Sequence, residues 1–549
     1  MKQPLRRPVN RQARAIEKTF PPPVGGWVAN KSIASMKPTE AVELINFFPR
    51  TTHVETRMGS QQHMILERES IKTMVVWKGP TGTEKMLCTT STGVFDASFG
   101  GTSGEPSRAI IATRTNGKHQ SDQFGDGTNN WLIMVNGVDK PVYYNGVSTV
   151  LVDAVSSPAI TGITSTDIVG LGVFKNRLLF IRNNKLGFDY LPAAAAGGAT
   201  SYFDLSSVAA RGGYLMAIGV WSRDAGLGPD DYAVFITSQG EALIYAGTDP
   251  SSATTWSLIG TYKIGKPLGR KCILKYGTDP LVLTESGVFP LSALLTAGDE
   301  RERFAVSYNI QNAFSDASAN TISTYGWRMV SYPEQDMLIV NVPKREDGPH
   351  EQFVMNTITK AWCKFTGWDA EDFCVFNRTL YYCKGDTIYE AWTRVTDEYK
   401  KLMGGGTSFP VGKAITHTAR SSFQDWGSED IKQPLMFMPI IESPRNAPYS
   451  VGIDTDFRVT EFLDPPTEDD NGVARWGSGL WGVSRWGGSD TITRRWQGAG
   501  TWPGRWLSGK IRLKSVPLST VYESAYGTEV PALAKWVGSV IRYTIGKST

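Results

Sequence analysis

Histidine and cysteine are both scarce in this sequence of 549 residues, which contains five of each. The cysteines form no C-x-x-C pair, so the sequence predicts neither a zinc site nor a disulfide framework, and we expect free thiols. The histidines lie in no H-E-x-x-H motif, and no G-x-S-x-G elbow is present. We therefore assign no catalytic residue, no metal ligand and no cofactor, and we expect a protein that is not an enzyme. The cysteines are Cys88, Cys272, Cys363, Cys374 and Cys383.

Long apolar runs are also missing. No stretch approaches the roughly 20 apolar residues that a membrane-spanning helix needs. The N-terminus is basic but lacks the apolar core segment of a secretory signal. A strong charge of one sign is absent as well, since 57 Lys and Arg residues stand against 53 Asp and Glu residues.

Glycine and aromatic residues are abundant, with 56 glycines and 17 tryptophans. Short runs of apolar and β-branched residues alternate with polar breaks, as in Tyr232–Thr237, Ala242–Ala246 and Trp256–Ile264. Successive strands without helices between them cannot form a parallel sheet, because parallel neighbours need long crossover connections. The sequence therefore predicts a mainly β protein built of antiparallel blades or a barrel.

The short strands recur from residue 61 to residue 397 in units of roughly 45–60 residues, which is the spacing of four-stranded propeller blades. This spacing admits five to seven blades. Lys175-Asn176 is expected to be a tight turn between two of the strands. Two helices are predicted in addition, a short one at Pro38–Phe47 with proline in its first turn and an amphipathic one within Glu302–Ala319.

One segment approaches a nucleotide-binding motif. Gly260–Pro267 has the spacing of a P-loop up to its lysine, Lys266. Pro267 replaces the Ser or Thr that would hold magnesium, and no helical pattern follows to present amides to a phosphate. We therefore interpret the segment as a strand and its turn.

The first 18 residues carry six basic side chains and one acidic side chain, with prolines that interrupt any early helix. A segment of this kind cannot form a core of its own. We interpret it as an arm that docks on a neighbouring protein surface, with contact to nucleic acid as one alternative and a solvated tail as another. Its candidate docking residues are Arg6, Arg7, Arg11 and Arg14.

Tryptophan and arginine recur together near the C-terminus, within a glycine-rich region. Arginine beside tryptophan can stack on the ring, and both residue types are enriched in interfaces. We therefore predict a subunit or partner interface, the alternative being rings that fold back onto their own sheet. The candidate interface residues are Arg475, Trp476, Trp481, Arg485, Trp486, Trp496, Trp502 and Trp506.

An ordered set of short motifs resembles the tail nozzle proteins of short-tailed bacteriophages, also called tail tubular protein B or head-to-tail stabilisation proteins that retain packaged DNA. The resemblance covers roughly residues 21 to 509. Its residues are Pro23–Trp27, Met36, Glu40-Ala41, Asn46–Pro49, Val54–Gly59, Trp221–Gly226, Asp230-Asp231, Gly240-Glu241, Ile244-Tyr245, Gly247–Pro250, Trp256-Ser257 and Ile264–Pro267.

The resemblance implies a six-bladed propeller and a homohexamer around a central channel. The hexamer would attach to the adaptor, or connector, ring of the tail and would be contacted by tail fibres or tip proteins. It would retain the packaged genome and conduct the DNA during ejection, without sequence specificity. The protein would then belong to the virion and be assembled in the host cytoplasm.

We thus expect three regions: a basic arm and lead-in segment (1–60), a β-propeller (61–397), and a C-terminal β-rich platform and interface domain (398–549). The alternative function is a propeller-based tail component that binds or degrades glycans. The repeated Ser-x-Asp-x-Gly-x-x-Trp turns of sialidase-type propellers are absent from the sequence.

Overall fold

Strands dominate the computed structural model of the chain, which confirms the mainly β prediction. The strands belong to two units. Residues 58–413 form the propeller unit, and the segments before and after them together form a second one, here called the platform unit. The residues described by the structure are 15–66, 70–102, 109–111, 113–224, 229–296, 303–345, 348–400, 412–443, 448–465, 473–474, 485–486, 491–498, 502–515 and 533–545.

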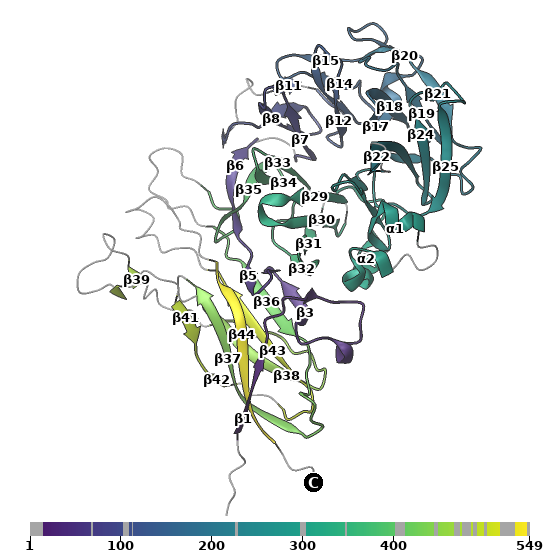
Figure 1. The fold of residues 1–549 in the computed structure, drawn as a ribbon. Coiled ribbons are helices and arrows are strands. Elements are labelled where there is room, and N and C mark those ends of the chain that lie inside the picture. Colours follow the sequence, from purple (N-terminus) through teal and green to yellow (C-terminus); the bar gives the residue numbers. More distant parts are fainter. Residues whose placement is uncertain are drawn as a thin grey trace, which may run out of the picture. The chain divides into compact units, whose positions relative to one another are not determined.

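The propeller unit consists of antiparallel sheets that follow one another along the chain, and in all but the last of them the first strand lies innermost (Figure 1). Four sheets of four strands come first. They are β7 (Thr73–Lys78), β8 (Glu84–Thr89), β9 (Val94–Asp96) and β11 (Ala109–Ile111); β12 (Gln120–Gly125), β13 (Asn130–Val135), β14 (Val142–Tyr144) and β15 (Thr149–Leu151); β17 (Ile168–Phe174), β18 (Arg177–Arg182), β19 (Gly187–Tyr190) and β21 (Ser201–Asp204); and β22 (Leu215–Asp224), β23 (Pro229–Thr237), β24 (Glu241–Gly247) and β25 (Trp256–Lys263).

A smaller three-stranded sheet follows, and two further blades complete the ring. The strands are β26 (Ile273–Leu274), β27 (Leu281–Thr284) and β28 (Gly287–Pro290); β29 (Arg328–Tyr332), β30 (Met337–Pro343), β31 (His350–Asn356) and β32 (Trp362–Phe365); and β33 (Asp372–Phe376), β34 (Thr379–Lys384), β35 (Thr387–Arg394) and β6 (Gly59–Ile65). Short additional elements are β10 (Gly101–Thr102), β16 (Ile160–Thr161), β20 (Gly198–Ala199), α1 (Leu291–Thr296) and α2 (Gln311–Ser318).

The expected six-bladed propeller is confirmed as six blades that each contain four consecutively paired strands. Within the described residues, the three-stranded sheet β26–β28 takes a further position between the blades that begin with β22 and β29. Each innermost strand contacts the next, from β7 through β12, β17, β22, β26, β29 and β33 back to β7, so the ring is closed.

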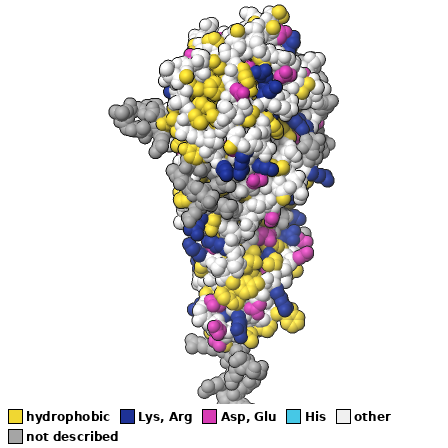
Figure 2. All heavy atoms as spheres, turned by 90° about the vertical axis from the view of Figure 1, so that its right-hand side faces the viewer, with side chains coloured by type: hydrophobic (Ala, Val, Ile, Leu, Met, Phe, Trp, Pro, Cys, Tyr) yellow, Lys and Arg dark blue, Asp and Glu magenta, His cyan; other side chains and the backbone are white. Residues whose placement is uncertain are grey.

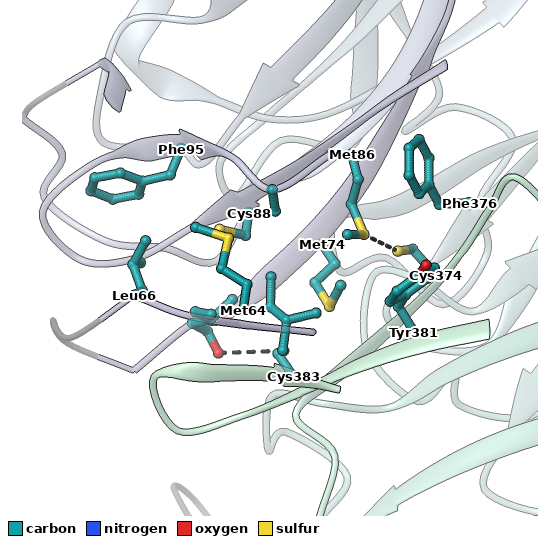
Figure 3. Close-up of a cluster of buried hydrophobic side chains, with 13 residues drawn as sticks. Met64, Leu66, Met74, Met86, Cys88, Phe95, Cys374, Phe376, Tyr381 and Cys383 are labelled. Carbon is teal, nitrogen blue, oxygen red and sulfur yellow. Dashed lines mark hydrogen bonds between the residues drawn. The ribbon is translucent and has the colours of Figure 1, made fainter. Parts of the chain in front are cut away.

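The ring is closed by a strand from the start of the propeller unit. β6 pairs antiparallel with β35 and forms the outer strand of the last blade. A cluster of buried side chains fills the space between this blade and the first one, with Met74 and Met86 from the first and Cys374 and Cys383 from the last (Figure 3). The Cys374 thiol donates a hydrogen bond to the Met86 sulfur at 3.4 Å, and the Cys383 thiol donates one to the Ile71 carbonyl oxygen at 3.6 Å.

All five cysteines are buried free thiols, as predicted. Burial raises the pKa of Cys88 and of Cys272 to about 12. Because the thiolate is the reactive form, these side chains behave as small apolar core residues.

Turn chemistry agrees with the sequence in the hairpin between β17 and β18. Lys175 and Asn176 both have positive φ, 43° and 57°, which matches the twist of the flanking strands. The predicted tight turn is therefore confirmed. β17 also alternates buried and half-buried residues along its length, as a strand with two different faces should.

The two helix predictions fare differently. Pro38–Phe47 is not helical, because Glu40–Ile45 is strand β3, whose pairing with β36 (Thr416–Ser421) overrides the local propensity. Between Glu302 and Ala319 only residues 311–318 form an α-helix, α2, after a short 3-10 turn at Tyr308–Ile310. Of the apolar stripe predicted there, Phe314 is buried, whereas Phe304 is 56% exposed.

The platform unit takes strands from both ends of the chain. One sheet has the order β4-β5-β44-β37-β41, with β1 added on β44 and β42 on β37, and the other joins β2, β3, β36, β43 and β38. The lead-in segment and the C-terminal domain of the sequence-based division thus belong to the same unit. The remaining strands are β1 (Ala15–Phe20), β2 (Gly26–Trp27), β4 (Phe47–Pro49), β5 (Val54–Thr56), β37 (Lys432–Ser443), β38 (Tyr449–Thr455), β39 (Val473–Ala474), β40 (Arg485–Trp486), β41 (Thr491–Arg494), β42 (Gln497–Gly498), β43 (Leu507–Lys514) and β44 (Lys535–Ile545).

Strand β1 lies within the predicted arm. Ala15–Phe20 pairs antiparallel with β44 in the register Ala15 to Thr544 through Phe20 to Ser539. Residues 15–18 of the arm are therefore part of a sheet of their own chain. The ring of Phe20 packs edge-on against the ring of Trp426, with the two ring centroids 5.2 Å apart. Arg6, Arg7, Arg11 and Arg14 lie outside the described residues.

The ring closure can be tested at Gly59, which is buried in β6. A Cβ atom at this position would overlap the carbonyl oxygen of Thr396, a backbone atom that cannot move aside. We expect Gly59→Ala to lower the free energy of unfolding by about 1–3 kcal/mol, the usual cost of overpacking. Urea denaturation followed by tryptophan fluorescence measures the change.

The control for Gly59→Ala is Gly125→Ala, where a Cβ atom would meet only the side-chain oxygen of Asn130, at 3.1 Å. Equal stability of the Gly59 and Gly125 variants would contradict the importance of a close backbone approach at the closure.

Candidate functional site

A cavity of about 540 Å³ opens in the propeller unit. Its wall takes residues from just before or at the start of the innermost strands β12, β22, β26, β29 and β33. The innermost strands of successive propeller blades point in the same direction along the propeller axis. Their first residues therefore lie at one end of the ring. Pockets with a few convergent polar groups are the usual ligand sites of proteins, so this cavity is the candidate site.

Asp372, the first residue of β33, is buried at the wall of the cavity. Its carboxylate accepts hydrogen bonds from Arg328 Nη1 at 2.5 Å, from Lys271 Nζ at 3.0 Å and from the backbone amide of Met74 at 2.9 Å. Burial acts to raise the pKa of Asp372, but the positive charges of Arg328 and Lys271 outweigh it, and the pKa lies below its ordinary value. Asp372 is therefore an anion shared by two cations.

Burial has the opposite effect on the lysine of this cluster. It lowers the pKa of Lys271 to about 8, although the Asp372 carboxylate acts to raise it. The ammonium groups of Lys271 and Lys118 lie 5.8 Å and 5.3 Å from the centroid of the Tyr325 ring. The Tyr325 and Thr73 hydroxyls share a hydrogen bond of 2.7 Å, which fixes the ring that both lysines approach.

Arg270 is held in a different way. Its Nη1 donates to the carbonyl oxygens of Leu215 at 3.2 Å and Met216 at 3.3 Å, and its guanidinium lies 5.5 Å from the Tyr214 ring centroid. Burial lowers the pKa of Arg270. Among the described residues, no carboxylate lies within 4.0 Å of its guanidinium.

The second acidic residue of the wall forms its hydrogen bonds with residues outside the wall. Glu371 accepts hydrogen bonds from Ser70 Oγ at 2.6 Å and from Lys72 Nζ at 2.7 Å, and neither donor is a wall residue. The five cations of the wall, Lys118, Lys266, Arg270, Lys271 and Arg328, thus face two acids, Glu371 and Asp372. The wall carries a formal surplus of three positive charges.

The sequence pointed to two residues of this wall, Lys266 and Pro267, for another reason. Lys266 belongs to the segment with P-loop spacing, which the structure shows to be the end of strand β25 and a turn with Gly265 at φ 83°, as interpreted. Arg270, Lys271, Arg328 and Asp372 were not identified. Charged residues just before β26 and at the start of β29 and β33 are the signal that could have located them, once the blades were counted.

The predicted interface residues lie in the platform unit and are only partly described. Arg475, Trp476 and Trp481 lie outside the described residues, and Arg485-Trp486 forms strand β40, which pairs with β39. The guanidinium of Arg542 lies over Trp496, 4.4 Å from the centroid of the Trp496 ring. The arginine that stacks on Trp496 therefore comes from strand β44 and not from the neighbouring sequence.

The two remaining tryptophans of this set have contrasting environments. Trp502 is 76% exposed. Trp506 packs against Phe457, with ring centroids 5.4 Å apart, and its backbone amide donates to Asp456. Trp506 therefore folds back onto its own unit, as the alternative interpretation requires, while Trp502 presents an apolar ring to solvent.

Within the described residues, no group of three or more His, Cys, Asp and Glu side chains is placed to hold a metal ion. No helix in this part of the chain is long and apolar enough to cross a membrane.

No protein-family model and no curated protein matches this sequence. Among solved structures, the chain is similar to the β-propeller domain of Cps50 (Swd1) from Myceliophteria thermophila, with 10% identity and a TM-score of 0.38, covering 62% of this chain and 99% of that one. It is also similar to the extracellular domain of a protein described as a hybrid two-component system from Bacteroides thetaiotaomicron. The identity is 10% and the TM-score 0.38, and the match covers 79% of this chain and 57% of that one.

A third similar structure is a quinonprotein alcohol dehydrogenase-like protein from Bacteroides thetaiotaomicron, with 9% identity and a TM-score of 0.31, covering 59% of this chain and 68% of that one. At these identities and scores, the three structures do not bear on the function of this chain.

Asp372→Asn tests the shared-anion cluster. Removing the buried charge leaves the half-buried Lys271 and Arg328 without their anion, so we expect a loss of about 3 kcal/mol in the free energy of unfolding at pH 7. Because the folded pKa of Asp372 is lowered, its stabilisation is present above the unfolded pKa and disappears as pH falls through the folded value. The difference between wild type and variant should therefore shrink as the pH is lowered from neutrality toward about 3.

The control for Asp372→Asn is Glu334→Gln. Glu334 pairs with Arg378, whose side chain is 83% exposed, so little change is expected at any pH. If the difference in the free energy of unfolding between the wild type and Asp372→Asn stays constant with pH, packing and not charge causes the loss of stability.

Proposed function

We propose that this chain is the structural subunit of the tail nozzle of a short-tailed bacteriophage. The observation that supports it is the coincidence of two features in one stretch of chain. The ordered motifs that resemble the nozzle family continue through residues 221–267, and most of this stretch folds into the propeller blade β22–β25, the architecture that the resemblance implies.

In this proposal, six copies surround a channel, attach to the adaptor ring and are contacted by tail fibres or tip proteins. The role is mechanical, and the protein is not an enzyme. The hexamer retains the packaged genome and then conducts it, as part of a virion assembled in the host cytoplasm.

The charge distribution is compatible with a conduit. Each phosphate contact adds salt-dependent affinity, so a channel that passes DNA should not hold it tightly. The chain carries only four more basic than acidic residues. On the face shown in Figure 2, positive side chains lie in small groups among negative and neutral ones.

The platform unit offers a physical basis for load-bearing. Its first sheet places β1, from the N-terminal segment, and β37 on the two sides of β44, near the C-terminus, through continuous antiparallel ladders. Pulling on either end of this unit must break several hydrogen bonds of a ladder together. Strands β1 and β44 are thereby held in one sheet.

The proposal is tested by assembly. Purified chain is mixed with purified adaptor rings of short-tailed phages, and size-exclusion mass and negative-stain images are recorded. We expect rings of six copies on the adaptor. A monomer that stays unbound under all conditions, but binds or cleaves an oligosaccharide, would instead establish the glycan-directed alternative.

Trp502→Ala tests the interface within this assembly. An exposed aromatic anchor can contribute about 2 kcal/mol or more to an interface. We expect this variant to impair ring formation without a change in melting temperature, because Trp502 is largely exposed in the single chain.

Trp506→Ala is the matched control for Trp502→Ala. Trp506 packs on Phe457, so its removal should lower the melting temperature of the chain. Unimpaired assembly of the Trp502 variant would remove Trp502 from the interface.

Deleting residues 1–14 tests the docking arm while leaving strand β1 intact. We expect the truncated chain to fold normally and to bind nozzle-less particles more weakly in co-sedimentation. Binding of the full-length chain should weaken as salt rises, because exposed charge contacts are screened over about 8–10 Å. Equal binding by both chains at every salt concentration would show that the arm does not dock.

A further inference from the structure

We propose that the cavity of the propeller unit binds a small phosphate monoester, with its dianionic phosphate held by Arg270, Lys271 and Lys266 and its organic part in the remainder of the cavity. This proposal does not depend on the proposed nozzle function. It rests on the charges, the hydrogen bonds, the size and the lining of the cavity.

The first argument is charge. The wall carries three more cations than acids, and one of its two acids, Glu371, is bonded to Ser70 and Lys72, outside the wall. Like charges gathered in a half-buried cavity repel each other more strongly than they would in water. A bound dianion would offset two of the three surplus charges.

The second argument is the bonding of Arg270. A guanidinium has five N–H donors, and Arg270 uses only Nη1, for two backbone carbonyls. Its Nε and Nη2 donate to no described residue. The two carbonyls and the Tyr214 ring hold the guanidinium in place, so these donors are oriented before a ligand arrives. The N–H groups on Nε and Nη2 form a pair of donors whose spacing matches two oxygens of a phosphate.

The third argument is the size and mixed lining of the cavity. Its volume of about 540 Å³ exceeds what a phosphate ion needs and lies within the range of organic ligand sites. Val169, Met216 and Ile322 contribute apolar surface beside the charged groups. These side chains suit the organic part of a monoester better than a second anionic group.

Isothermal titration calorimetry of the full chain tests the proposal with three probes: ribose 5-phosphate, inorganic phosphate and ribose. We expect saturable binding of ribose 5-phosphate, weaker binding of inorganic phosphate that competes with it, and no binding of ribose. If phosphate and ribose 5-phosphate bind equally, the site takes a free oxyanion and the monoester assignment is wrong.

Two variants locate the site. Arg270→Gln should weaken ribose 5-phosphate binding about tenfold or more, as the loss of a charge-assisted hydrogen bond predicts. Lys266→Gln should weaken binding about two- to threefold by removing one nearby charge. Lys266 is exposed, so this variant is expected to fold even if Arg270→Gln does not.

Arg177→Gln is the matched control. Arg177 also donates to a backbone carbonyl, that of Leu191, and also lies 5.5 Å from a tyrosine ring centroid, that of Tyr190, but it is not part of the cavity wall. Its variant should bind ribose 5-phosphate like the wild type. Absence of saturable binding up to about 10 mM, or equal loss in Arg177→Gln and Arg270→Gln, would overturn the proposal.

Discussion

The pairing of β6 with β35 is the contact on which the propeller depends. It joins residues more than 300 positions apart and closes a ring of sheets, whose first and last members would otherwise each leave one face without a neighbour. Closure costs chain entropy, but that cost grows only slowly with the length of the loop. The buried methionines and cysteines between the first and last blades supply the apolar contact that offsets it (Figure 3).

The sequence revealed the parts of the fold that are set by neighbours along the chain. Alternating apolar runs and turn residues such as Lys175-Asn176 identify hairpins, because a hairpin is closed by its own turn. Glu40–Ile45 was mistaken for a helix because its partner, β36, begins more than 370 residues later. The same limit hid the common platform unit, in which β1 pairs with β44. No local pattern carries information on such pairings.

The cavity could not be predicted for a related reason. Its charged residues lie in four separate segments, at Lys118, within 266–271, at Arg328 and at 371–372, and only the order of the blades brings these segments to one end of the ring. Each of them is unremarkable in its own segment, since a lysine or arginine before a strand is normally a solvated loop residue. The predicted interface relied instead on a local cluster of residues, which the sequence displays directly, but the structure divides its members between exposed Trp502 and packed Trp506.

Closure and charge are linked at Asp372. This residue begins β33 in the last blade, yet it accepts a hydrogen bond from the Met74 amide in the first blade and binds cations that precede β26 and begin β29. A carboxylate shared in this way stabilises the junction of the blades only while its two cations stay in place. The positive charges it cannot neutralise remain at the cavity wall. The closed ring therefore gathers at one end a cationic surface that none of its blades has alone.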